Sequence, residues 1–243
     1  MTMTSSESVS FHSAAADRYR IGGELFRGED GPGVVLLPDV HGVSALYRSL
    51  GSRLAEAGFP CLVLDLYRRE GAPELSDPAE VFAWIAGLPD ERVLGDVAAA
   101  LAYVDAQVTT PPGGTGLLGF CLGGQYSLMA ACRQPKPSAC VSFYGMLRYD
   151  RTSANKPTSP LDMTPSLGCP LLGLFGEDDA LIPSSDVEEL RRRLSANGKD
   201  FDCVTYPGAG HAFLNEARPE SFRPEAAADA WERAIDFFGR HLR

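Results

Sequence analysis

Short apolar runs alternate along this chain with longer segments in which apolar residues recur every three or four positions. Runs of the first kind are typical of strands buried on both faces of a parallel sheet. We expect such strands at residues 33–37, 61–66, 115–120, 139–144, 170–175 and 201–206, after a first strand at 19–26.

The intervening segments have helical periodicity. In the first of them Leu46, Leu50 and Leu54 share one face, and Gly58 follows the last predicted turn. We expect helices at residues 44–57, 79–87, 91–107, 123–132, 185–196 and 224–242. Because strands and helices alternate, the pattern predicts an α/β fold with a mostly parallel sheet and helices on both faces.

Two stretches interrupt this alternation without forming a linker. Residues 68–89 contain three prolines and predict a small cap-like segment over the sheet. Residues 147–167 form a polar excursion, and connections of that length are usually functional or mobile. Residues 1–16 have neither a basic start nor an apolar core, so we expect a flexible lead-in rather than a signal peptide. Residues 17–243 then form a single domain.

Composition narrows the classes of partner. The net charge is −10 and no basic stripe is present, which argues against a nucleic-acid partner. No apolar run approaches the ~18 residues that span a bilayer, so we expect no membrane partner. The six cysteines are scattered singly without C-x-x-C spacing, which indicates reduced thiols in a cytoplasmic protein. The four histidines are too dispersed to suggest a metal site.

Residues 117–124 (LLGFCLGG) carry the clearest chemical signal. An apolar strand ends at Cys121, with glycines on both sides and a helix-forming segment behind it. This arrangement is that of a nucleophile elbow, G-x-S-x-G, with cysteine in the central position. Small neighbours are needed because the nucleophile has a strained backbone and the strand and helix approach closely. The alternative is a tight strand-to-helix turn that holds a buried structural cysteine.

Polar side chains follow four of the predicted strands, and the carboxyl ends of parallel strands meet at one edge of a sheet. They are Asp39, Cys121, Asp179 and His211. The last three occur in the chain order of α/β-hydrolase triads. A thiol needs a base to become a thiolate, and His211 would take its proton and later give it to the leaving group. Asp179 would fix the tautomer of the imidazole.

Two further assignments complete this candidate site. Asp178 is the alternative to Asp179, because only one of two neighbouring carboxylates is expected to face His211. The oxyanion would be held by the backbone N–H groups of Leu122, next to the thiol, and of Val40 in an earlier loop.

With Asp179 and His211 in order after it, and with Asp65-Leu66-Tyr67 after the third predicted strand, the elbow at residues 119–124 resembles the dienelactone hydrolase (carboxymethylenebutenolidase) family. The resemblance covers roughly residues 17–243, and the cysteine elbow is its most specific part. It implies an α/β-hydrolase fold and hydrolysis of an enol-lactone or related ester through an acyl-enzyme on Cys121. It implies no metal and no organic cofactor.

The chain departs from the family in two places. A carboxylate, usually Glu, contacts the resting thiol in the family, and here the shorter Asp39 occupies that position. The alternative for Asp39 is a loop aspartate that makes a turn bond. The family also holds a substrate carboxylate with two arginines, one in the cap helix and one shortly after the catalytic His. The first position falls near residues 78–82 and the second near Asn215, and neither carries an arginine here. Arg218 lies slightly beyond the second position, and Arg48, Arg68 and Arg69 are the other candidates to replace it.

Without the two arginines, the substrate pocket could be more apolar than in the family. We expect its lining among His41, Phe82, Trp84 and Phe213, with Arg218; ordinary packing is the alternative for each.

The favoured function is a cysteine-dependent hydrolase of a small-molecule lactone or activated ester. A thioesterase or acyltransferase with the same triad, and a non-catalytic protein that binds a small ligand, are the alternatives. We expect a monomer or small homo-oligomer.

Overall fold

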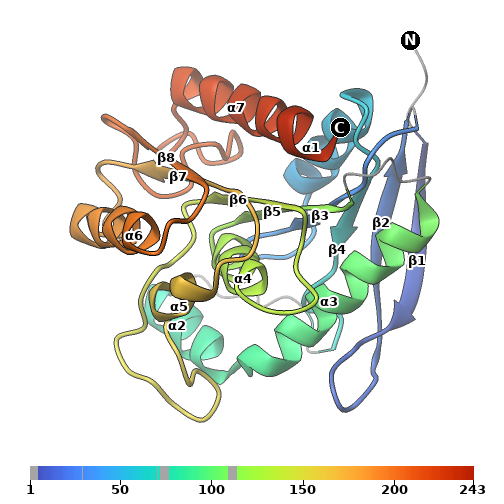
Figure 1. Cartoon of the computed structure of the whole chain (residues 1–243), viewed down its shortest axis with the longest axis horizontal. Helices are drawn as coiled ribbons and strands as arrows, with labels where there is room; N and C mark the ends of the chain where they lie inside the picture. The colour runs from blue at the N-terminus through green and yellow to red at the C-terminus, as the bar shows by residue number, and fades with distance from the viewer. Residues whose placement is uncertain (1–4, 29, 70, 72–76, 109–113) are drawn as a thin grey trace.

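The computed structural model describes residues 5–28, 30–69, 71, 77–108 and 114–243 (Figure 1). In this part of the chain eight strands form one sheet in the order β1-β2-β4-β3-β5-β6-β7-β8. The strands are β1 (Ser5–His12), β2 (Arg20–Arg27), β3 (Val34–Leu37), β4 (Cys61–Leu64), β5 (Gly116–Phe120), β6 (Ala139–Phe143), β7 (Leu171–Gly176) and β8 (Phe201–Tyr206). All pairs from β4 to β8 are parallel, whereas β1–β2 and β2–β4 are antiparallel.

Helices cover both faces of this sheet. They are α1 (Ala45–Glu56), α2 (Pro78–Gly87), α3 (Asp90–Gln107), α4 (Leu122–Ala131), α5 (Pro160–Met163), α6 (Ser184–Ala196) and α7 (Pro224–Leu242). In Figure 1, α1 and α7 lie above the sheet and α3 and α4 lie below it. The α/β fold with a mostly parallel sheet that the alternating pattern predicts is therefore confirmed.

The central strand β3 shows why its sequence is apolar throughout. Val34 and Leu36 belong to one buried cluster, and Val35 and Leu37 to the other. Because successive side chains of a strand point to opposite faces, a strand with helices on both sides has no polar position.

The N-terminal residues differ from the expectation of a flexible lead-in. Residues 5–12 form β1, which pairs with β2 along its whole length. The ring of Phe11 stacks on Tyr103 of α3, with ring centroids 4.6 Å apart. The prediction was wrong here because an exposed edge strand with few apolar residues has no clear periodicity, and its pairing depends on partners distant in sequence.

The two irregular stretches contain short helices. The cap-like segment contains α2, which begins after Asp77, whose carboxylate accepts a hydrogen bond from the Ala79 N–H at 2.7 Å. Residues 70 and 72–76 of this segment lie outside the described residues. The excursion at 147–167 includes α5 and a 3₁₀ turn at Thr164–Ser166. Of the helices in the described ranges, none is both long enough and apolar enough to cross a membrane.

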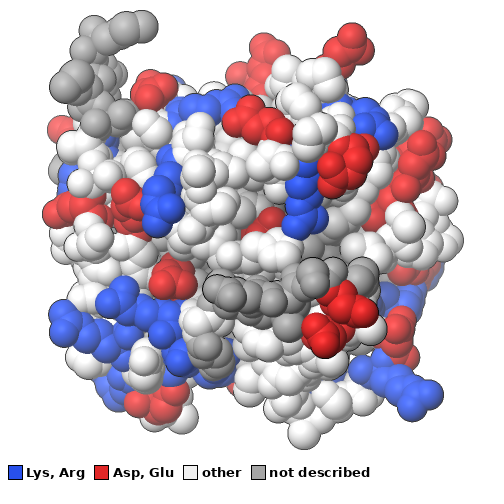
Figure 2. Space-filling model, turned by 180° about the vertical axis from the view of Figure 1, so that it is seen from behind, with Lys and Arg blue, Asp and Glu red and all other residues white. Residues whose placement is uncertain are grey.

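Lys and Arg side chains gather at the lower left of the face in Figure 2, and over the rest of this face they are interspersed with Asp and Glu.

Candidate active site

Cys121 occupies the turn between β5 and α4 and has φ 54° and ψ −115°. Positive φ is strained for any residue with a Cβ, and such strain is concentrated at functional sites. A Cβ at Gly123 would lie 2.2 Å from the carbonyl oxygen of Leu37, and one at Gly119 would lie 2.1 Å from that of Gly123. Only glycine fits at these two positions, as an elbow requires.

The six thiols differ in exposure. Cys121, Cys169 and Cys203 are partly exposed, and the other three are buried. Burial raises the pKa of the thiols of five cysteines, which are Cys61, Cys132, Cys140, Cys169 and Cys203. Since the thiolate is the nucleophile, these five are poorly suited to react at neutral pH.

His211 and Asp179 form a hydrogen-bonded pair at the same edge of the sheet. The imidazole Nδ1 lies 2.8 Å from Oδ2 of Asp179, whose side chain is fully buried. The other carboxylate oxygen, Oδ1, accepts backbone hydrogen bonds from Leu181 at 2.9 Å and Ile182 at 3.2 Å. Asp178 is exposed. The structure therefore brings Asp179, and not its neighbour, to the imidazole.

The remaining ring nitrogen of His211, Nε2, is buried and has no hydrogen-bond partner among the described residues. Burial opposes the charge on the ring, but the negative charge of Cys121, followed by the hydrogen bond and charge of Asp179, outweighs burial and raises the pKa of His211. The imidazolium is therefore favoured whenever Cys121 is a thiolate.

Asp39 makes the turn bond that was the alternative to a thiol contact. Its Oδ1 accepts the backbone N–H of His41 at 2.9 Å. The carboxylate also acts on Tyr47, whose pKa is raised by burial and then by the charge of Asp39. Contact between Asp39 and the resting thiol stays a prediction.

Three buried tyrosines to which the sequence analysis assigned no role surround this region. Burial first, and then the charges of Asp39 and Cys121, raise the pKa of Tyr47, Tyr67 and Tyr144. Tyr67 donates a hydrogen bond to the carbonyl of Asp39 at 3.0 Å. Tyr67 directly follows one predicted strand and Tyr144 is the last residue of another, so neither position indicated a role at the site.

Tyr144 has the closest relation to the triad residues. It has φ 38°, and its ring meets that of His211 edge-on, with centroids 5.2 Å apart. A bulky residue at positive φ is a backbone outlier that its surroundings must enforce. The ring therefore forms a fixed wall beside the imidazole.

The expected oxyanion donors lie on two segments in close approach. Leu122 is the first residue of α4, so its N–H has no carbonyl one turn earlier in the helix. Gly123 packs directly against the carbonyls of Leu37 and Pro38, which places the loop that contains Val40 beside the start of α4. An oxyanion role for Leu122 and Val40 agrees with this arrangement and stays a prediction.

The predicted pocket residues have separate environments. His41 is exposed, and its Nε2 lies 2.6 Å from Nη2 of Arg218. Phe213 is fully buried and packs against Tyr144, so it supports the site from beneath and lines no open pocket. For Phe213 the structure thus shows the ordinary packing that was the alternative to a pocket role.

The two aromatic residues of α2 also differ from each other. Trp84 packs edge-on against Tyr67, with centroids 5.0 Å apart, whereas Phe82 is exposed.

Of the other arginines, Arg48 pairs with Glu24, and Arg69 pairs with Asp17 and Asp96. Among the candidate arginines, Arg218 acts electrostatically on Tyr144. Its positive charge lowers the pKa of this tyrosine, although burial and the charges of Asp39 and Cys121 raise that pKa by more.

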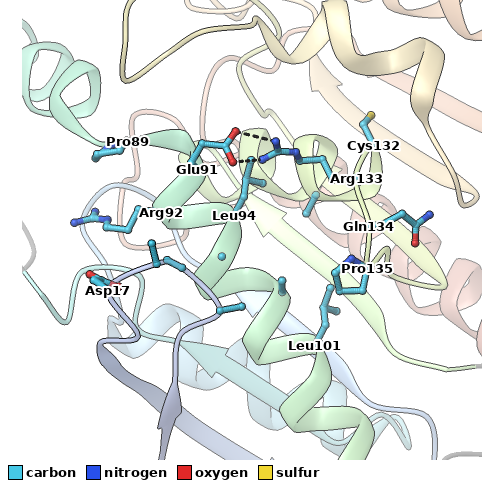
Figure 3. A pocket seen from close by; sticks show the side chains of 16 residues that line it. Asp17, Pro89, Glu91, Arg92, Leu94, Leu101, Cys132, Arg133, Gln134 and Pro135 are labelled. Atoms are coloured by element: carbon cyan, nitrogen blue, oxygen red, sulfur yellow. Dashed lines mark hydrogen bonds and ion pairs between the residues drawn. The ribbon is translucent and has the colours of Figure 1, made fainter.

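A hollow of about 900 Å³ lies elsewhere, between the loop at residues 14–17, α3 and the end of α4 (Figure 3). Its lining includes Cys132, a full helix length from Cys121. It is therefore separate from the triad residues. Among the described residues, no group of three or more His, Cys, Asp or Glu is placed to hold a metal ion.

The mostly parallel sheet with its elbow after β5 defines an α/β-hydrolase. The sequence model of the Dienelactone hydrolase family matches residues 23–242. The chain belongs to the dienelactone hydrolase family, whose members are lactone and ester hydrolases, and the resemblance found in the sequence is confirmed.

Individual relatives agree with this assignment. A Bradyrhizobium protein assigned as a 2-oxo-3-(5-oxofuran-2-ylidene)propanoate lactonase is 36% identical over 87% of this chain and 84% of its own length. An Escherichia coli K12 protein assigned as a carboxymethylenebutenolidase is 34% identical over 86% of this chain and 77% of its own.

Solved structures show the same fold. A protein assigned as a dienelactone hydrolase from Klebsiella pneumoniae superposes with a TM-score of 0.87 at 30% identity, covering 97% of this chain and 99% of that one. A dienelactone hydrolase-like promiscuous phosphotriesterase from metagenomic libraries has a TM-score of 0.79 at 21% identity, covering 99% of each chain. At 21% identity, the similarity to the phosphotriesterase shows a shared fold and nothing more.

Proposed function

We propose that the protein hydrolyses a lactone or activated ester through an acyl-enzyme on Cys121. The observation that supports this proposal is a partly exposed thiol at a positive-φ elbow, whose charge raises the pKa of an imidazole that is hydrogen-bonded to a buried carboxylate. The name of the Bradyrhizobium relative describes a lactonase, which supports a cyclic ester as the substrate class.

In the first half of the reaction His211 holds the proton of the Cys121 thiol. The thiolate attacks the carbonyl carbon, a C–S bond forms, and the N–H groups of Leu122 and Val40 stabilise the oxyanion. When the tetrahedral intermediate collapses, the C–O bond breaks and the imidazolium gives its proton to the leaving oxygen. In a lactone the resulting hydroxyl stays attached to the acyl group.

In the second half His211 acts as a base toward water. The charge of Cys121 is the largest of the effects that raise the pKa of His211, and acylation removes this charge. The pKa of the ring then falls, and the neutral imidazole takes a proton from water as the water oxygen attacks the thioester. The C–S bond breaks, the thiolate returns, and the proton goes back to the Cys121–His211 pair. Asp179 holds the ring in place throughout.

The test is selective alkylation of the folded protein. One equivalent of iodoacetamide at neutral pH should label Cys121 ahead of the other five cysteines, because burial raises the pKa of those thiols. Loss of hydrolysis of an aryl ester should follow the labelled fraction, as measured by peptide mass spectrometry. Cys121→Ala should abolish turnover, whereas Cys203→Ala on β8 is the matched control. Equal labelling of all six thiols, or activity in Cys121→Ala, would refute the mechanism.

A further inference from the structure

A second hollow lies between the cap-like segment and two segments that carry neighbours of the candidate triad residues. It has a volume of about 750 Å³, which is in the range of small-molecule sites. Its walls are α2, the excursion that follows β6, and the turn that follows β7.

Two of the segments that form this hollow also carry residues that contact the candidate catalytic groups. Leu181 lies in the wall, and its backbone N–H donates to Oδ1 of Asp179. Met146 lies in the wall two residues after Tyr144, whose ring faces His211. These two links connect the hollow to the surroundings of Asp179 and His211.

Exposed apolar side chains line this hollow. Among the described residues, the large hydrophobic side chains that are exposed belong to Tyr19 at 43%, Phe82 at 39% and Leu181 at 43%. Phe82 and Leu181 both line this hollow, although they come from segments about a hundred residues apart. Apolar surface of this kind in a concave place next to reactive groups is typical of a ligand site.

The charges around the hollow cancel each other. Arg148 pairs with Asp186 at 3.2 Å. Lys156 is buried and pairs with Asp90 at 2.7 Å. Arg151 and Asp150 are neighbours of opposite sign on the exposed rim. A carboxylate placed in the hollow would find no net positive charge, whereas an alkyl or aryl group would cover Phe82 and Leu181.

We infer that this hollow binds an uncharged apolar substituent of the ester or lactone, with Phe82 and Leu181 as the residues that determine specificity. The inference rests on the proposed hydrolysis at Cys121 but concerns a separate property, the preference for chain length. It offers a reason why the cap carries no arginine at residues 78–82.

The first measurement is kcat/KM for γ-lactones and p-nitrophenyl esters with linear alkyl chains of increasing length. Burial of one methylene contributes about 0.8 kcal/mol, or roughly fourfold, so kcat/KM should rise by up to about fourfold per carbon until the hollow is filled. In Leu181→Ala and in Phe82→Ala the ratio of long-chain to short-chain kcat/KM should fall. Tyr19→Ala is the matched control, since this equally exposed side chain lies outside the hollow, and it should keep the wild-type ratio.

A second measurement separates this inference from the hydrolytic mechanism. The alkylation rate of Cys121 by N-hexyl iodoacetamide, relative to N-methyl iodoacetamide, does not depend on turnover. The wild type should favour the hexyl reagent, and Leu181→Ala should lose this preference. Equal rates in the wild type would overturn the inference. A preference for chains that end in a carboxylate, abolished by Arg151→Gln, would also overturn it. Absence of hydrolysis with the hexyl preference intact would refute the proposed function alone.

Discussion

The buried pair of Lys156 and Asp90 provides a sharp test of what holds the excursion over the sheet. Only 4% of the Lys156 side chain and 1% of that of Asp90 are exposed. The ammonium donates to Asp90 and to the Tyr126 hydroxyl, both at 2.7 Å, and the Tyr149 hydroxyl donates to Asp90 at 3.0 Å. The network thus links the excursion to α3 and α4.

The expected effect of Lys156→Met follows from this burial. The desolvated carboxylate of Asp90 would keep two tyrosine hydroxyls but lose its counter-charge. Removal of one partner of a buried pair costs about 3–5 kcal/mol, because the remaining charge is uncompensated. For a domain of this size we therefore expect Tm to fall by roughly 6–20 °C.

Burial also limits how much the intact ion pair contributes to the stability of the protein. It lowers the pKa of Lys156, although the hydrogen bond and charge of Asp90 act in the opposite direction. The ammonium is therefore held at an energetic cost. The double variant Asp90→Asn/Lys156→Met should be more stable than Lys156→Met, since its network contains no unpaired charge.

The assay is urea unfolding followed by circular dichroism, with thermal scans alongside. Arg148→Ala is the matched control, because it removes an ion pair from the same excursion whose arginine side chain is 45% exposed. Such an exposed pair contributes at most about 1 kcal/mol. If Lys156→Met loses no more stability than Arg148→Ala, or if the double variant is no more stable than Lys156→Met, the reasoning about the buried charge is wrong.

Two predictions concern the candidate active site. Cys121→Ala removes the largest of the effects that raise the pKa of His211, so the imidazole should titrate at lower pH than in the wild type; an unchanged NMR titration of its Cε1 proton would contradict this. Asp39→Asn removes a negative charge near the thiol and should change the pH dependence of Cys121 alkylation. If Asp39 makes only the turn bond to His41, the amide oxygen will replace it and the profile will stay as in the wild type.

Most of the fold could be predicted because its strands are buried on both faces. Such strands have no polar position, as in β3, and they stand out from the amphipathic helices between them. The elbow was also predictable, because the close approach at Gly119 and Gly123 excludes other residues. Strand β1 was missed, since its apolar residues are few and it pairs at the edge of the sheet.

Contacts between distant segments could not be predicted from the sequence. The pairing of Lys156 with Asp90 joins residues 66 positions apart, and no local pattern distinguishes Lys156 from a solvated lysine. The tyrosines around Cys121 come from three segments, and Phe213 turns into the core from a loop. In each case burial depends on how the elements pack together, which periodicity does not encode.

The reactive groups of the site and its specificity depend on different parts of the fold. Cys121, Asp179 and His211 each lie within a few residues of the end of a parallel strand, so the order of the strands alone brings them to one edge of the sheet. The proposed apolar hollow is instead built by α2 and the excursion, which are the segments without sheet periodicity. Substitutions at Phe82 or Leu181 therefore alter surfaces that the strands do not fix. We expect them to change which substituent is accepted while the hydrogen bond between His211 and Asp179 stays in place.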